Sequence, residues 1–299
     1  MSKSVLVVGS MVSAMLLACM AALLTAVPGA SKTQTVTLVG AGDIAGCDFK
    51  TDRKTARLLG KIPGTVFTLG DSAYPDGTRE QFRDCYDPTW GKYKKRTRPT
   101  AGDQDYVTSG AKPYFDYFGW RAGEPSRGYY SYDRGAWHIV ALNSNCKEVD
   151  GCDWRSAQGR WLSRDLDRHR GRCTLAYFHH PLYASGSGYD SPKVKPFWHI
   201  LYNYHADVIL NGHAHRYERF APLTPSGERS SARGIRQFIV GTGGAPGGTQ
   251  QGPDEPRVQA KKVGAPGVLK LHLGSGFYHW KFVSVAGRNY TDSGRARCH

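Results

Sequence analysis

The sequence has 299 residues, of which 40% are hydrophobic and 22% are charged. This is an ordinary globular composition, long enough for one domain with a sizeable core or for two small domains. The formal net charge of +15 favours acidic partners such as phosphorylated small molecules, nucleic acid or anionic surfaces. The basic residues are dispersed apart from the run at residues 92–98, which we interpret as a solvated helix end. No known nucleic-acid-binding motif appears, so we expect no specific nucleic-acid partner.

Residues 1–30 have the pattern of a secretory signal peptide. Lys3 supplies a positive charge, residues 5–26 form an apolar stretch, and the small residues 27–30 precede the polar Ser31. We therefore predict a secreted protein whose remaining part, residues 31–299, is a single domain without a stable membrane partner. The apolar stretch is long for a signal peptide, so an uncleaved N-terminal membrane anchor is the alternative. Residues 16–19, which end at Cys19, weakly resemble a lipoprotein box.

Cysteine usage agrees with export. Removal of Cys19 with the signal leaves six of the seven cysteines, an even number that fifteen pairings could connect. Two of them enclose a short loop, and the last one could tie the C-terminal tail to a predicted strand, which leaves one further pair. The predicted disulfides are Cys146–Cys152, Cys173–Cys298 and Cys47–Cys85. A zinc cluster fits less well, because no CxxC spacing appears.

The first part of the chain alternates apolar strands with helices, and the last part consists mostly of strands. We predict strands at residues 35–43, 65–71, 128–132, 137–143, 173–178, 206–210, 236–241, 267–273 and 278–285. We predict helices at residues 53–59, 80–96, 156–169 and 192–205, the second of them interrupted at Asp87-Pro88. Residues 112–127 are predicted to be an aromatic loop and residues 243–256 a long mobile loop. No linker divides residues 31–299, so we expect an α/β protein of one domain.

Polar residues that can bind metal ions lie in turns at the ends of strands. They are Asp43, Asp71, Asp103, His179, His213 and His215. Open α/β sheets place their ligands beyond the carboxyl ends of their strands, so these residues can share one site. His213 and His215 follow the buried strand 206–210, and two side chains at positions i and i+2 of an extended segment point the same way.

Carboxylates and imidazoles without thiolates suit iron, zinc or manganese rather than a structural zinc site. Because more than four ligands are available, we predict two metal ions, with a carboxylate able to bridge them. Two metals roughly 3.5–4 Å apart can hold the attacking and leaving oxygens of an in-line displacement at phosphorus.

The ordered motifs resemble those of the calcineurin-like metallophosphoesterase superfamily. They are Gly42-Asp43, Gly70-Asp71, Gly102-Asp103-Gln104-Asp105, His179 and Gly212-His213-Ala214-His215. Residues 70–74 resemble the GDxxY variant of the purple acid phosphatases, and residues 212–219 are similar to the GHxHxYER motif of the same family. Other segments look closest to bacterial secreted members of that group. The resemblance spans residues 36–244 and implies a four-layer α/β/β/α sandwich with mixed sheets.

The resemblance also implies a role for each motif residue. One metal would be bound by Asp43, Tyr74 and His215, and Asp71 would bridge to the second metal. The second metal would be bound at the position of Asp103 and by His179 and His213. The His-x-Pro pattern of the family favours His179 rather than His180 as the ligand. His180 would then face the substrate and assist or orient the leaving group.

The third motif departs from the family, where it usually reads Gly-Asn-His-Asp/Glu. Asp103 keeps an oxygen that can bind metal but adds a negative charge, which would repel a phosphate dianion. Gln104 replaces a histidine that is thought to protonate the leaving group or bind phosphate. Glutamine can donate a hydrogen bond but cannot deliver a proton, and a lost general acid commonly lowers the rate by about 10²–10⁴. The first motif is also one residue longer than the GDxG of the purple acid phosphatases.

Our leading hypothesis is a secreted phosphomonoesterase in which a hydroxide held by the ions attacks phosphorus in line, with a small phosphate ester as substrate. A phosphodiesterase is the close alternative, because the same metal core serves both reactions. A catalytically weakened relative that only binds metal and phosphate is the alternative from another class. The change at Asp103-Gln104 and the positive net charge favour this last alternative.

Overall fold

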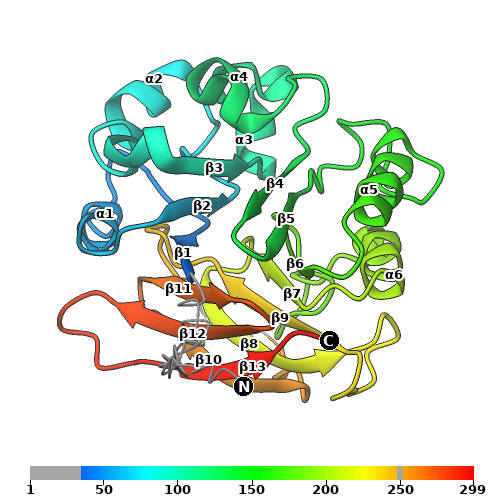
Figure 1. The fold of residues 1–299 in the computed structure, drawn as a ribbon. Helices are drawn as coiled ribbons and strands as arrows, with labels where there is room; N and C mark the ends of the chain where they lie inside the picture. The colour runs from blue at the N-terminus through cyan, green and yellow to red at the C-terminus, as the bar shows by residue number, and fades with distance from the viewer. Residues whose placement is uncertain (1–34, 248–251) are drawn as a thin grey trace, which may run out of the picture. The chain divides into compact units, whose positions relative to one another are not determined.

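The computed structural model describes residues 35–247 and 252–299 (Figure 1). The predicted signal peptide, its alternative as an anchor and the lipoprotein box therefore lie outside the described residues. Among the residues that are described, no helix is both long and apolar enough to cross a membrane.

Two mixed sheets form the centre of the fold. The first has the strand order β13-β12-β11-β1-β2-β3 and the second has the order β10-β8-β9-β7-β6-β5-β4. The first sheet comprises β1 (Val36–Ala41), β2 (Thr65–Leu69), β3 (Thr97–Thr100), β11 (Gly267–Gly274), β12 (Phe277–Ser284) and β13 (Ser293–Arg297). The second comprises β4 (Tyr130–Arg134), β5 (Trp137–Ala141), β6 (Cys173–Tyr177), β7 (Val208–Asn211), β8 (Arg216–Leu223), β9 (Ile235–Val240) and β10 (Val258–Val263).

Helices cover the outer faces of both sheets and the end near the site. The α-helices are α1 (Asp52–Lys61), α2 (Arg79–Gln81), α3 (Asp103–Val107), α4 (Lys112–Phe118), α5 (Ala157–Arg168) and α6 (Lys195–Asn203). Shorter helical segments of other types are η1 (Phe82–Tyr86), η2 (Trp90–Arg96), η3 (Ser109–Ala111), η4 (Gly119–Ala122) and η5 (Pro192–Val194).

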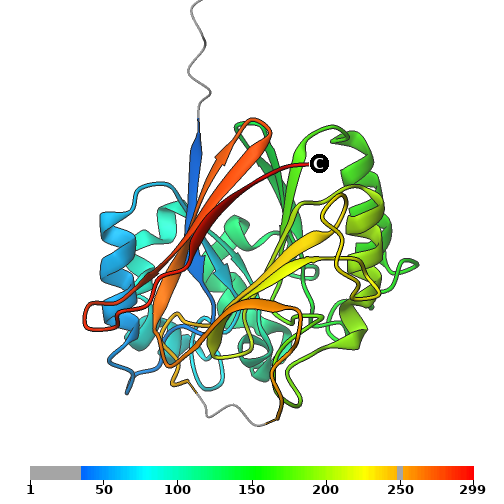
Figure 2. The same cartoon turned by 90° about the horizontal axis from the view of Figure 1, so that it is seen from below.

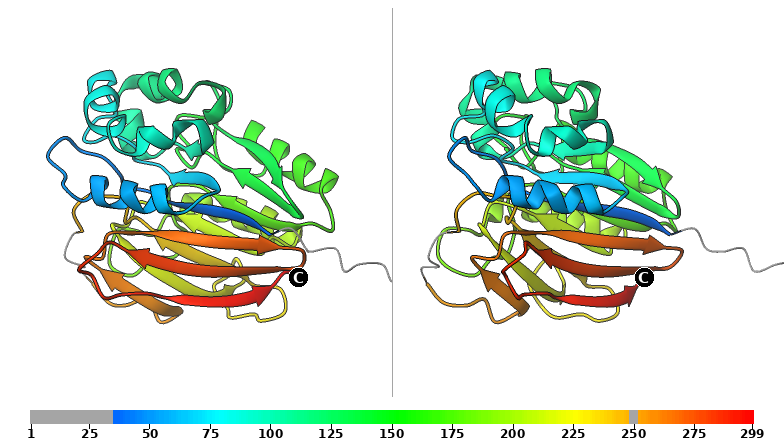
Figure 3. Two further views of the ribbon diagram at one scale, coloured as in Figure 1. Left: turned by 60° about the vertical axis from the view of Figure 1, so that its left-hand side comes forward. Right: turned by 90° about the vertical axis from the view of Figure 1, so that its left-hand side faces the viewer.

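The layers run α/β/β/α, as the resemblance implied. Helix α1 packs on the first sheet beside β11, and α5 and α6 pack together on the far side of the second sheet (Figures 2 and 3). Side chains from the two sheets meet in the main core, where the rings of Phe67 and Tyr177 lie 6.2 Å apart. A second core cluster joins strand residues such as Ile209 to Leu162 of α5 and Trp198 of α6. The predicted four-layer sandwich is therefore confirmed.

The topology brings the ends of the parallel strands together. In the first sheet β1, β2 and β3 are parallel, and in the second sheet β5, β6, β7 and β9 are parallel. Strand β7, which contains the apolar run 208–210, is fully buried, and so are β2, β5 and β6, as expected for strands covered on both faces. The turns that carry the candidate ligands follow β1, β2, β3, β6 and β7.

Several local predictions were wrong. Strands β3, β8, β10 and β13 were not expected, and residues 112–118 form α4 rather than a loop. Pro113 suits the first turn of this helix, and Tyr114, Phe115 and Phe118 are buried by tertiary packing that no helical periodicity signalled. The predicted helix 80–96 is divided into α2, η1 and η2, and Asp87-Pro88 lies in the break. In the loop predicted to be mobile, residues 243–245 are buried and hydrogen-bonded to the turn after β1.

The six cysteines form three disulfides. They are Cys47–Cys85, Cys146–Cys152 and Cys173–Cys298, the pairs expected from the sequence. The last of these joins the start of β6 to the residue after β13, and thereby ties the edge of the first sheet to the centre of the second.

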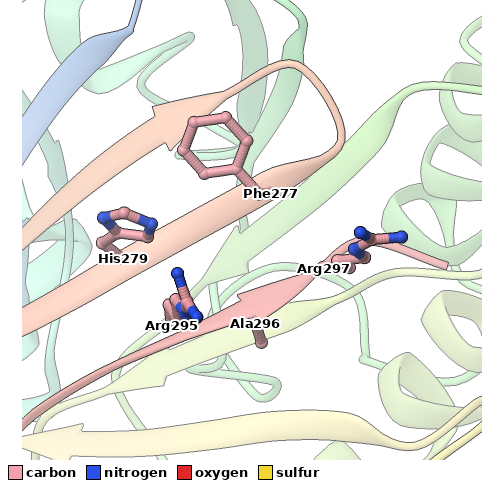
Figure 4. A pocket seen from close by; sticks show the side chains of 5 residues that line it. All are labelled: Phe277, His279, Arg295, Ala296 and Arg297. Carbon is pink, nitrogen blue, oxygen red and sulfur yellow. The ribbon is translucent and has the colours of Figure 1, made fainter.

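The outer face of the first sheet is basic at its exposed edge. Figure 4 shows His279, Arg295 and Arg297 beside Phe277 along a hollow on β12 and β13. In the antiparallel register His279 pairs with Arg295, and Lys281 pairs with Lys270 of β11. The two lysines therefore place like charges opposite one another across the strands, which is an unfavourable arrangement.

Candidate metal centre

Three candidate ligands occupy strained turns just beyond the strands. Asp43, Asp71 and His213 have φ angles of 59°, 52° and 68°, in the left-handed region that non-glycine residues rarely adopt. Such strain costs of order 1–3 kcal/mol per residue and clusters at functional sites. His213 therefore does not continue the extended strand that was predicted to aim both histidines at one spot. Strand β7 ends at Asn211, and the turn at His213 sends the two imidazoles to different neighbours.

Glycine is required where these turns meet. A Cβ atom on Gly102 would lie 2.1 Å from Asp71 Oδ1, and one on Gly70 would lie 2.5 Å from His179 Nδ1. The Gly-Asp pattern thus has two functions. The absence of a side chain on glycine lets its backbone lie close to neighbouring site residues. The aspartate that follows is thereby held next to them.

One half of the site gathers around Tyr74. Its phenolic oxygen donates to Asp71 Oδ2 at 2.8 Å and also lies 3.1 Å from Asp43 Oδ1 and 3.2 Å from His215 Nε2. His215 Nε2 is in turn 3.3 Å from Asp43 Oδ1. Asp43, Tyr74 and His215 are the residues predicted from the resemblance to bind the first metal, with Asp71 as the bridge, and the four come from three separate segments of the chain.

The other half gathers around Asp103. Its Oδ1 lies 2.8 Å from His179 Nε2, 3.2 Å from His213 Nδ1 and 3.5 Å from His180 Nε2. Oxygen and nitrogen atoms of these four side chains lie within 4.8 Å of one another, as a shared metal ion requires. His180 is thus also within reach of this half, although the sequence favoured His179 alone as the ligand.

Asp71 lies between the two halves. Its Oδ2 accepts the bond from Tyr74, whereas its Oδ1 lies 3.5 Å from His179 Nε2. The backbone N–H of Gln104 donates to the same Oδ1 at 2.9 Å. One carboxylate oxygen thus faces each half, which is the arrangement expected of a bridging ligand.

Backbone carbonyls set the tautomers of two imidazoles. His179 Nδ1 lies 2.7 Å from the carbonyl oxygen of Leu69, and His215 Nδ1 lies 2.9 Å from that of Pro246. A carbonyl oxygen only accepts, so each Nδ1 carries the proton, and the lone pair of each neutral ring is on Nε2. Both Nε2 atoms point at carboxylate oxygens, an arrangement that needs a cation or an extra proton between them. Imidazoles oriented in this way by a carbonyl are typical of metal ligands.

The carboxylate oxygens of the site also fit a metal-binding site. Asp103 Oδ1 is buried and has no hydrogen-bond partner, although three imidazole nitrogens lie within 3.5 Å of it. Buried polar atoms are almost always hydrogen-bonded, so an orphaned carboxylate oxygen facing imidazoles indicates a cation site. The donor set of carboxylates, imidazoles and one phenol fits two ions of the Fe, Zn or Mn type.

The pKa values show how closely these charges interact. Burial would raise the pKa of Asp43 and Asp103, but the nearby histidines hold both below the usual value. Burial raises the pKa of Asp71 to about 6 against the effect of His179. Burial would lower the pKa of His215, but Asp43 raises it to about 9. Without metal, protonated imidazoles therefore supply the positive charge that the carboxylates need.

The departures in the third motif have clear structural consequences. The side-chain amide of Gln104 donates to Asp103 Oδ2 at 3.3 Å. Asp105 is fully buried, and its carboxylate accepts bonds from the backbone N–H groups of Gly102 and Ser72. Its role is thus to hold the turn that presents Asp103. Burial, with the charge of Asp71, raises the pKa of Asp105 to about 8.

Ser144 belongs to the site but was not selected from the sequence. Its hydroxyl accepts from the backbone N–H of His180 at 3.0 Å and lies 2.9 Å from His180 Nδ1. If this hydroxyl donates to Nδ1, the proton of the neutral ring is on Nε2, which faces Asp103. The sequence pattern could have identified Ser144, because it follows the apolar strand β5 in the way that the other site residues follow their strands.

The motif residues after His215 have structural rather than chemical roles. Tyr217 and Arg219 both donate to Asp292, in the segment that leads into β13, and so join the two sheets. Glu218 forms a buried ion pair with Arg216 at 2.7 Å and accepts from the backbone N–H of Ser185.

Comparisons with known proteins agree with this geometry. No protein-family model matches the sequence. The chain is 25% identical over 215 residues to purple acid phosphatase 15 of Arabidopsis thaliana, covering 60% of this chain and 40% of that protein. It is 25% identical over 229 residues to purple acid phosphatase 21 of the same plant, covering 68% of this chain and 49% of that protein. The chain thus spans less than half the length of either relative.

The fold is also similar to solved structures. The purple acid phosphatase PPD1 from yellow lupin (Lupinus luteus) seeds superimposes with a TM-score of 0.72 at 18% identity. The superposition covers 89% of this chain and 54% of the lupin chain. The sequence matches, the layer order and the arrangement of strand-end residues agree with one another. The chain therefore has the fold of the lupin purple acid phosphatase and is similar in sequence to the purple acid phosphatases.

Proposed function

We propose that this chain is a secreted hydrolase of phosphoric monoesters that uses two metal ions. The observation that carries the proposal is the position of Asp71, with one carboxylate oxygen toward Tyr74 and the other toward His179. Asp43, Tyr74 and His215 would hold the first ion, and Asp103, His179 and His213 the second.

When bound, two such ions lower the pKa of a water molecule and hold phosphoryl oxygens for in-line attack. The residues of the chain orient these ligands. The carbonyls of Leu69 and Pro246 keep the Nε2 lone pairs of His179 and His215 directed into the site. The neutral ring of His180, set by Ser144, would present Nε2–H to a phosphoryl or leaving-group oxygen. Burial and the charge of His179 lower the pKa of His180 to about 2, so it acts as a hydrogen-bond donor rather than a general acid.

The test is hydrolysis of p-nitrophenyl phosphate by the full chain before and after complete metal removal and after reloading with Zn²⁺, Mn²⁺ or iron. We expect activity that is lost with the metal and restored by it. Bis(p-nitrophenyl) phosphate, assayed on the same preparation, should be the poorer substrate. Activity that survives metal removal would overturn the proposal, and a preference for the diester would identify a phosphodiesterase instead.

A binding protein is the second candidate, and Asp103-Gln104 favours it. Asp103 adds negative charge beside the expected phosphoryl position, and Gln104 bonds Asp103 rather than offering a transferable proton. The double substitution Asp103→Asn with Gln104→His separates the two functions. A rise in turnover of the metal-loaded protein would indicate a weakened catalyst. Phosphate binding without turnover in either form would indicate a binding protein.

Secretion is part of the proposal. Three disulfides are typical of proteins that mature in oxidising compartments, which supports export. Expression of the full-length gene followed by N-terminal sequencing of the protein in the medium is the test. We expect a new N-terminus close to Ser31. Retention in the membrane fraction would favour the uncleaved anchor.

A further inference from the structure

A hollow of about 270 Å³ adjoins the second half of the site. Asp103 and His180 form the side that faces the candidate metal ligands. The remaining walls are Tyr106 and Val107 at the end of α3, the loop that begins at Asn145 after β5, and Lys193 in η5. A phosphoryl group held by the proposed centre would therefore have its leaving group beside this hollow.

The walls of the hollow are firmly held. Lys147 lies in the loop closed by the disulfide Cys146–Cys152, and the N–H of Glu148 donates to the carbonyl of Asn145 at 2.8 Å. On the other side, Lys193 lies in η5, whose Val194 is buried and donates to the carbonyl of Ser191. The backbone that carries each lysine is therefore already fixed before a ligand binds.

The charge in the hollow is available for a ligand. Lys147 and Lys193 are exposed, and within the described part of the chain neither ammonium group forms an ion pair. Lys193 is close enough for its charge to act on the ring of His180. Glu148 also lines the hollow, and its charge acts on Tyr106.

We propose that the site selects phosphomonoesters whose leaving group carries a second negative charge, which Lys147 and Lys193 bind. This inference rests on the proposed function. Water attacks phosphorus, the bond between phosphorus and the ester oxygen breaks, and the leaving oxygen takes up a proton. The products are inorganic phosphate and an anionic alcohol. The lysines orient that alcohol and offset the repulsion that Asp103 adds.

Two solvated lysines beside a site could instead act only on the transferred phosphoryl group, and a matched pair of substrates separates these roles. Phosphoglycerate with its phosphate on carbon 2 and glycerol 2-phosphate share the ester linkage, and only the former carries a carboxylate on the leaving group. The measured quantity is the ratio of kcat/KM for the phosphoglycerate to that for the glycerol phosphate, with the metal-loaded full chain.

We expect the wild-type ratio to exceed one. Lys147→Gln and Lys193→Gln should each lower it by about two- to fivefold, mainly because the phosphoglycerate then binds more weakly and its KM rises. High salt should lower the ratio in the same way, because the lysines are exposed. Lys195→Gln is the matched control, since this residue lies two positions from Lys193 and does not line the hollow. Its ratio should equal that of the wild type.

A ratio that none of the substitutions changes would overturn the inference, as would equal losses for both substrates. Binding of the two compounds to the metal-loaded protein, measured by calorimetry, gives a second readout that needs no turnover. The same lysine substitutions should weaken binding of the phosphoglycerate selectively. One outcome would separate the two proposals. If the protein hydrolyses neither substrate but binds the phosphoglycerate through these lysines, the proposed function is wrong and the anion-binding site is confirmed.

Discussion

Metal binding to this site should release protons and should strengthen steeply as the pH rises. Asp43 raises the pKa of His215 to about 9, against the effect of burial. Because Nδ1 donates to the carbonyl of Pro246, the second proton is on Nε2, the atom that would bind the metal. Removing it costs about 4 kcal/mol at pH 6 and about 1.4 kcal/mol at pH 8, at 1.36 kcal/mol per pH unit. His215 alone therefore predicts an affinity about 100-fold higher at pH 8 than at pH 6.

The assay is competition for Zn²⁺ between the metal-free protein and a chromophoric chelator, with proton release followed by an indicator dye in weak buffer. At pH 7 we expect at least one proton released for each ion bound. His179 should add to this, because Asp71 and Asp103 raise its pKa well above the usual value despite burial. His215→Gln should lower the pH dependence by about one decade per unit. His279→Gln, on the far edge of the first sheet, should not change it. Zinc affinity that is constant from pH 6 to pH 8 would refute the reasoning.

Three further predictions concern stability. Asp292→Asn should cost about 3 kcal/mol in the free energy of unfolding at pH 7, because it leaves Arg219 without its charged partner in a site where the two side chains are 11% and 14% exposed. His138 is 1% exposed between two aspartates, which raise its pKa despite burial. His138→Gln should therefore destabilise most below about pH 6.5, and the loss should fade as the pH rises through the raised value. Lys281→Glu should stabilise by about 0.5 kcal/mol at low salt, since it faces Lys270 across the strands.

Urea unfolding of the disulfide-intact chain measures all three. The burial of Asp292 would raise its pKa, but bonds from Arg219 and Tyr217 hold it low, so the loss in Asp292→Asn should shrink as the pH falls through that lowered value. A difference below about 0.5 kcal/mol at pH 7 would contradict the role given to this carboxylate. For His138→Gln, an effect that is equal at pH 5.5 and pH 8.5 would be inconsistent with a protonated imidazole. For Lys281→Glu, the gain must disappear in high salt, because surface charges are screened.

The motifs in the sequence, through their resemblance to the metallophosphoesterases, predicted the layer order, and the residue pattern predicted most of the side chains gathered at the centre. Asp43, Asp71 and His213 each follow an apolar strand at a glycine, so local chemistry marks both the end of the strand and the candidate ligand. The buried strands β2, β5, β6 and β7 were recognisable because their sequences are largely apolar, as burial on both faces favours. The three disulfides were also predicted correctly, from the even number of cysteines and from their positions in the sequence.

The elements that were missed lack such a pattern. Strand β13 has the sequence Ser-Gly-Arg-Ala-Arg, and it is a strand because β12 offers an edge with free hydrogen-bonding groups. Helix α4 is short and aromatic, and its apolar residues are buried by packing against other segments. Propensity is a weak guide where tertiary contacts decide the conformation.

The arrangement within the site was decided by the tertiary structure. His213 and His215 are two residues apart, yet one faces His179 and Asp103 and the other faces Asp43 and Tyr74. This separation depends on the left-handed backbone at His213, whose N–H donates to Asp43 Oδ2 at 3.0 Å. The sequence by itself determined which side chains come to the centre, because their types and turns are local properties. Only the folded chain determined how these side chains are spaced and which of them are neighbours, because that depends on contacts between segments far apart in the sequence.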